Sequence, residues 1–171
     1  TPFRVDSLGV ERVFSLYVRP EFGSRDPGFD QMLLVTPPDM PLEFLGLYAG
    51  SDEDFSDAVD MASLQVADVE VVATAADSLR LAFAAVRPGG EVEVMRLDFK
   101  TTLFGMGAVL QAALQNSADG GDAWQRVDPG DALADVEGNT ITLVGNVTRG
   151  DLLTEVEVRP RIFTPNGDGI N

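Results

Sequence analysis

The sequence predicts an all-β protein, an antiparallel β-sandwich of roughly nine to ten strands. Two observations carry this prediction. Apolar side chains recur at every second residue in most segments, which is the period of a β-strand. Turn-forming residues interrupt these segments roughly every eight to twelve residues. This spacing is typical of sandwiches, and it leaves an immunoglobulin-like, a jelly-roll and a cohesin-like arrangement open.

The composition supports one compact domain and excludes several kinds of site. The 171 residues include 28 acidic and 12 basic side chains, a formal net charge of −16, and no cysteine or histidine. Zinc sites, iron–sulfur clusters, thiol nucleophiles and histidine-based triads are therefore excluded. We expect no nucleic-acid binding, because the charge has the wrong sign, and no membrane insertion, because the apolar runs are too short. Hydrophobic residues make up 44% of the chain, enough to bury a core.

The first part of the chain predicts three strands, each closed by proline or glycine. In the first strand Phe14, Leu16 and Val18 alternate with more polar residues and therefore share one face. Pro20 ends it. The three predicted strands cover residues 12–18, 29–36 and 42–48.

An acidic stretch over residues 51–60 follows these strands. Its five carboxylates make a calcium loop conceivable, but the glycine that an EF-hand loop needs at its sixth position is missing. We expect a solvated loop that holds a single helical turn, with Ser51 or Asp52 as its N-cap.

The middle of the chain has the clearest alternation. Residues 66–104 form three runs, which are separated by turns at 75–78 and at Pro88-Gly89-Gly90. Short turns between alternating runs predict an antiparallel meander, in which the three strands are neighbours in one sheet.

Residues 105–116 allow two interpretations. They are rich in helix formers, yet their apolar residues also alternate. We favour a strand because strand-like segments flank them. Further on, two β-branched runs over 140–144 and 152–158 predict a hairpin. Its turn contains Asn146 in the sequence Asn-Val-Thr, which is either an unmodified turn or an N-glycosylation site.

The N-terminal residues carry candidate interface side chains. Phe3, Val5, Leu8 and Val10 are apolar with polar residues between them. They predict either the first strand of the sandwich or an arm that adds a strand to the open sheet of a neighbouring subunit. Sheet edges must be covered or paired, and strand addition is one way to pair them.

The last residues hold the most specific motif of the chain. The segment Phe163–Asn171, FTPNGDGIN, resembles the FTPNGDGIND opening of gliding-motility-associated C-terminal domains and of related immunoglobulin-like domains similar to the flagellar hook-capping protein. Such domains follow larger β-rich regions in secreted or surface-attached bacterial proteins, and some act in sorting through the type IX secretion route. The resemblance implies an extracellular or cell-surface location and a domain boundary near Arg159-Pro160.

The predicted organisation has three parts. Residues 1–10 form an N-terminal strand or arm, residues 11–159 form the sandwich, and residues 160–171 form a linker and the start of a following immunoglobulin-like domain.

Asn166 and Asp168 in the C-terminal motif are candidate calcium ligands. Asn-Gly-Asp-Gly is similar to calcium loops that supply oxygen ligands from alternate residues. Thr164 stands where such a loop has its first aspartate, and no glutamate follows. The alternative is a type I′ turn, in which the two glycine-containing pairs supply positive φ angles. Calcium is the one cofactor that the sequence suggests.

No set of residues predicts catalysis. The chain has neither a nucleophile elbow nor a phosphate-binding glycine loop, and no motif singles out two of its scattered carboxylates. We expect a structural module of a secreted or cell-surface bacterial protein. It would assemble with copies of itself or with adjacent domains through strand addition, as a filament or pilus-like subunit does. The alternative is a cohesin-like or adhesin-like binding module for a protein or glycan.

Overall fold

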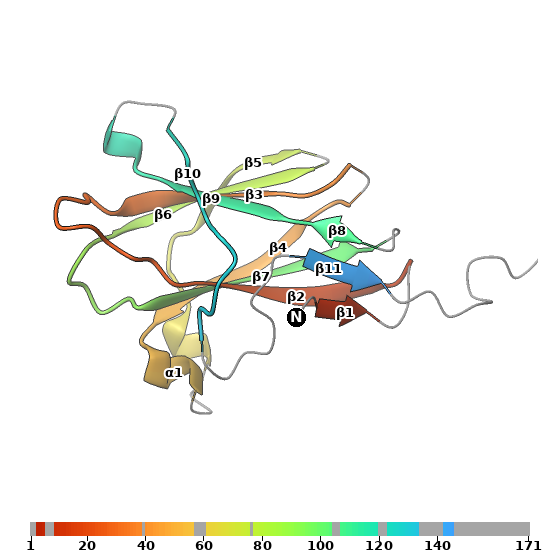
Figure 1. The fold of residues 1–171 in the computed structure, drawn as a ribbon, viewed down its shortest axis with the longest axis horizontal. Helices are drawn as coiled ribbons and strands as arrows, with labels where there is room; N and C mark the ends of the chain where they lie inside the picture. The colour runs from red at the N-terminus through yellow and green to blue at the C-terminus, as the bar shows by residue number, and fades with distance from the viewer. Residues whose placement is uncertain are drawn as a thin grey trace, which may run out of the picture.

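The structure is a computed structural model of the chain. It describes residues 3–5, 9–38, 40–56, 61–75, 77–103, 107–119, 123–133 and 142–145. The predicted fold class is confirmed: strands dominate, helix is nearly absent, and two antiparallel sheets form a sandwich (Figure 1). The described residues contain eleven strands, of which β8 and β10 span two residues each, so nine are longer.

The larger sheet has five antiparallel strands in the order β10-β9-β3-β6-β5. Leu79, Leu81 and Phe83 alternate along β6 and are buried, as the period of two predicts. The five strands are β3 (Phe29–Val35), β5 (Glu70–Ala75), β6 (Ser78–Val86), β9 (Gln111–Gln115) and β10 (Gln125–Arg126).

The facing sheet has three antiparallel strands in the order β2-β7-β4. They are β2 (Glu11–Val18), β4 (Glu43–Gly50) and β7 (Val94–Thr102). The register places Phe99 of β7 between Phe14 of β2 and Phe44 of β4. Leu16 is likewise opposite Leu97, so the face predicted for the first strand is the face that meets the core.

A third, smaller sheet has the order β1-β11-β8. Its strands are β1 (Phe3–Val5), β8 (Ala108–Val109) and β11 (Thr142–Gly145), and β1 runs parallel to β11. The N-terminal strand is thus paired within its own chain. Leu110 alone separates β8 from β9, so the chain passes from this sheet into the five-stranded sheet within one extended segment.

The core lies between the two larger sheets. Among its fully buried side chains are Phe99, Met32, Leu34 and Met95, each 1% exposed or less. The Phe14 ring stacks on that of Phe99 with 5.8 Å between centroids. Burying several large apolar side chains, at roughly 1.5–3 kcal/mol each, is the main contribution that holds the sheets together.

The predicted meander over residues 66–104 is wrong in its last step. β5 and β6 do form a hairpin, but β7 pairs with β2 and β4 in the opposite sheet. The turn at Pro88–Gly90 exists, and Gly90 N donates to Arg87 O at 3.2 Å. The connection nevertheless spans residues 87–93, long enough to cross between sheets. A turn signal locates a chain reversal without specifying which sheet receives the next strand.

Other local predictions agree with the structure. The ambiguous residues 105–116 contribute β8 and β9, so the strand interpretation is confirmed. The acidic stretch holds one short helix, α1 (Asp52–Ser56), which lies below the three-stranded sheet in Figure 1. Ser51 is its N-cap. Single-turn 3₁₀ segments follow at η1 (Met61–Leu64) and η2 (Ser117–Asp119). None of the helices in the described residues is long and apolar enough to cross a membrane.

Candidate functional site

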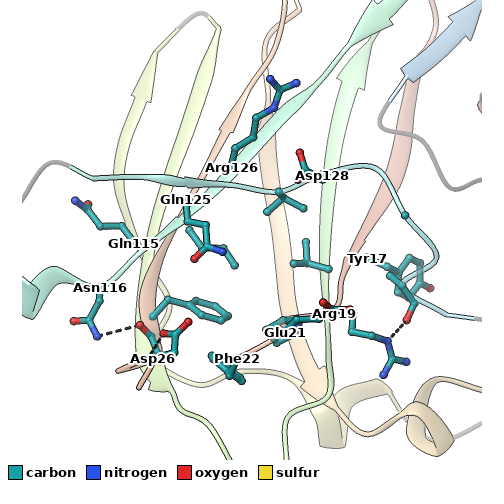
Figure 2. Close-up of a pocket in the computed structure, with 18 of the residues that line it drawn as sticks. Tyr17, Arg19, Glu21, Phe22, Asp26, Gln115, Asn116, Gln125, Arg126 and Asp128 are labelled. Carbon is teal, nitrogen blue, oxygen red and sulfur yellow. Dashed lines mark hydrogen bonds between the residues drawn. The ribbon is translucent and has the colours of Figure 1, made fainter. Parts of the chain in front are cut away.

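A pocket of about 420 Å³ lies along one open side of the sandwich. It is bounded by the end of β2 with the connection to β3, residues 17–29, and by the segment that follows η2, residues 123–132 (Figure 2). β2 and β10 are terminal strands of their sheets in the described part of the chain. The pocket therefore forms where the two sheets open toward solvent between neighbouring edges.

Aromatic rings form the base of the pocket. Phe22 and Phe29 stack with 6.0 Å between ring centroids and 22° between planes. Phe29 in turn meets Phe83 edge to face at 6.1 Å, which anchors it in the core. Phe29 is buried, whereas Phe22 is half-buried and keeps part of its ring accessible. The base is thus rigid and apolar.

One wall is organised around the backbone of Gly28. The Gly28 N–H donates to Asp26 Oδ1 at 3.0 Å, and Asn116 Nδ2 donates to the Gly28 carbonyl at 3.0 Å. Gly28 has a φ of +86°, and a Cβ at this position would lie 2.0 Å from the Val86 carbonyl oxygen. Only glycine fits both the conformation and the close approach. The sequence signal for this wall is the turn Asp26-Pro27-Gly28.

The segment after β9 is tied to the start of β3. Ser117 N donates to Asp30 Oδ1 at 2.8 Å, and the Ser117 hydroxyl donates to the other oxygen of the same carboxylate. Asn116 Oδ1 accepts from Ala118 N at 2.9 Å. These bonds hold Asn116 at the pocket with both ends of its amide engaged.

Arg19 closes the opposite wall. Its Nε donates to the Ala132 carbonyl at 2.9 Å, and its guanidinium forms an ion pair with Asp52 at the start of α1. Val127 N donates to Ala112 O at 2.8 Å, which joins the segment after β10 to β9. Residues more than 100 positions apart are therefore held around one pocket.

The polar side chains of the two bounding segments differ in whether they point into the pocket. Figure 2 shows Gln125 and Asp26 pointing into the space between the two segments, whereas Arg126 and Asp128 point away from it. In the described part of the chain, no group of three acidic residues is placed to hold a metal ion. The pocket offers an amide, a carboxylate and an aromatic surface, a combination suited to binding a polar ligand.

A second polar cluster lies on the outer face of the three-stranded sheet. Arg96 lies over the Tyr17 and Tyr48 rings, 5.8 and 5.6 Å from their centroids, and contacts both carboxylate oxygens of Asp98. The hydrogen bonds to Asp98 raise the pKa of Arg96 above its ordinary value, against the opposing effect of burial. Ser15 Oγ donates to Asp98 at 2.6 Å.

This cluster contacts the segment that crosses from β4 to β5. The Phe55 ring of α1 meets Tyr17 edge to face at 6.0 Å, and Met61 Sδ lies 3.9 Å from Arg96 Nη1. Arg96, Asp98 and Ser15 are engaged with one another. The contacts of Phe55 and Met61 stabilise the crossover on the sheet.

None of the predicted site residues that the structure describes lines the pocket. Phe3 and Val5 lie in β1, and Val10 is 47% exposed beside β2. Leu8, Asn146, Asn166 and Asp168 lie outside the described residues, so the predicted calcium and glycosylation sites stay predictions. The sequence does not predict the pocket, because its residues come from segments far apart in the chain and form no motif.

Comparison with known proteins gives no family for this chain. No protein-family model matches it, and none of the curated proteins matches it significantly.

Proposed function

We propose that the chain is a structural module of a secreted or cell-surface bacterial protein that assembles with copies of itself through an exposed sheet edge. The FTPNGDGIN motif supports the location. The observation that carries the assembly is strand β5. It ends the five-stranded sheet, and within the described residues it pairs only with β6.

The composition of β5 favours pairing with another strand. All six residues are exposed, and Val71 and Val72 keep 43% and 44% of their surface accessible. Most edge strands carry charges or prolines that discourage pairing, whereas β5 has one charge, Glu70. An apolar edge whose outer backbone groups pair with no described strand is suited to strand addition.

A second copy of the chain is the partner that suits this edge. Two β5 strands paired antiparallel would place their Glu70 side chains at opposite ends of the contact. Copies that carry −16 each repel one another, so a contact with few charges is the one at which they can meet. The register shift between Val71 and Ala73 marks a bulge, which twists the edge. We therefore expect reversible association.

In this proposal residues 1–10 do not act as an arm donated to a neighbouring copy. Because β1 pairs with β11 of the same chain, the assembly proposal rests on β5. Removal of residues 1–8 should then leave assembly intact.

Val72→Lys tests the proposal. It adds a charge to the β5 edge, and Val13→Lys adds the same charge to an exposed valine of β2 that is 58% accessible. Sedimentation velocity over a range of concentrations should show self-association for the wild-type chain and for Val13→Lys, and a shift toward monomer for Val72→Lys. A wild-type chain that stays monomeric at every concentration, or equal behaviour of the two variants, would rule out assembly through β5.

A binding module for a protein or glycan is the second candidate function. The pocket beside β2 and β10 favours it, because its walls are held by hydrogen bonds and its base carries a partly accessible aromatic ring. Binding of a soluble ligand by a monomeric form of the chain would distinguish this function from assembly.

A further inference from the structure

The pocket beside β2 and β10 has a lining that indicates the class of its ligand. We propose that it binds an uncharged, hydroxyl-rich ligand, a neutral oligosaccharide. The inference rests on the second candidate function and names its ligand. It is independent of the β5 contact, since no residue of β5 lines the pocket.

The size of the pocket suits such a ligand. Small-molecule sites typically enclose about 300–1,000 Å³, and this pocket of about 420 Å³ lies at the lower end of that range. One or two sugar rings fit a space of this order.

The inward polar groups match hydroxyls. The Gln125 amide supplies both donors and an acceptor, and it forms no hydrogen bond with any described residue. Asp26 supplies an acceptor: its Oδ1 accepts from Gly28 N, and its Oδ2 accepts from no described residue. A hydroxyl can donate to the carboxylate and accept from the amide, so one ligand chemistry satisfies both groups.

The charges around the pocket argue against an anionic ligand. Arg126 points away from the space, and Arg19 is engaged with Asp52 and with the Ala132 carbonyl. Among the described residues that line the pocket, neither guanidinium is therefore aimed at a uronic acid or a sulfate group in the space, and acidic side chains outnumber the two arginines. The net charge of −16 adds a general repulsion of anions.

The base of the pocket supplies the apolar contact. Phe22 is half-buried and backed by Phe29, so its accessible part is fixed in position. The C–H face of a sugar ring can pack on such a surface while its hydroxyls reach Gln125 and Asp26. The hydrogen bonds at Gly28 already fix this wall of the pocket in the unbound protein. Binding therefore costs little conformational entropy of the protein.

An array of neutral, uronic-acid-containing and sulfated oligosaccharides tests the inference with the full chain. Neutral oligosaccharides should bind and the acidic ones should not. Titration calorimetry with the strongest neutral oligosaccharide should then show a loss of about tenfold or more in affinity for Gln125→Ala and for Phe22→Ala. Gln111→Ala, which removes an exposed glutamine of β9 outside the pocket, should bind as the wild type does. Circular dichroism confirms that each variant is folded.

Four outcomes would overturn the inference. Preferred binding of acidic oligosaccharides would contradict the charge argument. A neutral ligand whose affinity is equal in Gln125→Ala, Phe22→Ala and Gln111→Ala would place the glycan site elsewhere and leave the binding-module function standing. The absence of glycan binding, with salt-sensitive binding of an arginine-rich peptide instead, would replace the glycan by a basic polypeptide. If neither probe binds, the binding-module function fails as well.

Discussion

The guanidinium of Arg96 forms two parallel hydrogen bonds with the carboxylate of Asp98, its neighbour two residues along the same face of β7. Nε donates to Oδ1 at 2.7 Å and Nη2 donates to Oδ2 at 2.8 Å. The same guanidinium lies over two tyrosine rings. Lysine can reproduce neither the paired bonds nor the stacked plane.

Arg96→Lys should therefore lower the free energy of unfolding by about 1–3 kcal/mol. Urea denaturation measures the difference. The matched control is Arg87→Lys in the exposed turn after β6, which should change stability by less than about 0.5 kcal/mol. Equal stability of the two variants would show that the cluster on the outer face contributes nothing to the fold.

Gly28→Ala should be strongly destabilising. The new Cβ would lie 2.0 Å from the Val86 carbonyl oxygen, and the φ of +86° is unfavourable for alanine. We expect a loss of roughly 3 kcal/mol or more in the free energy of unfolding. In Gly23→Ala the Cβ meets nothing within 4 Å, so this variant should stay close to the wild type. Similar melting temperatures for the two variants would contradict the assigned backbone geometry at Gly28.

The acid dependence of stability should depend in part on Asp54. Its carboxylate accepts from the backbone N and from the hydroxyl of Ser51, both at 2.8 Å, and these bonds lower the pKa of Asp54 below its ordinary 3.8. A lowered folded-state pKa stabilises the fold above the unfolded pKa, and this contribution is lost as the pH falls through the folded value.

Asp54→Asn should thus melt below the wild type at neutral pH, with the gap closing in acid. Melting curves of both proteins from neutral pH to below pH ~3 measure this convergence. Ser51→Ala removes one of the two bonds and should give a smaller gap of the same sign. A gap that is constant with pH would show that the Asp54 charge does not contribute.

Phe99→Ala should cost about 3–5 kcal/mol in the free energy of unfolding, because it opens a cavity at the centre of the sandwich. The ring is 1% exposed and stacks on Phe14. Val13→Ala on β2 removes a side chain that is 58% exposed and should change stability by less than about 0.5 kcal/mol. Denaturant midpoints compare the two. A small effect at Phe99 would mean that the two sheets pack differently.

Much of the local structure could be predicted from the sequence, for reasons visible in single elements. Phe14, Leu16 and Val18 share a face because side chains alternate along any strand, whatever sheet it joins. The helical turn after Ser51 follows from a capping side chain within three residues of its partner. Such features depend on neighbours in the chain, and so the sequence by itself determined the all-β class and most strand positions.

Only the tertiary structure decided which strands became neighbours and where a pocket formed. The sequence predicts β6 and β7 as adjacent strands of one sheet, yet β7 belongs to the opposite sheet. There one face of β7 meets the core and the other carries the polar cluster around Arg96. Asn116 reaches the Gly28 carbonyl across 88 positions, and Arg19 reaches Ala132 across 113. Such contacts depend on which pairing of strands buries the apolar faces of both sheets best, and this depends on the whole chain. A local pattern of residues therefore does not predict which strands pair or where a pocket forms.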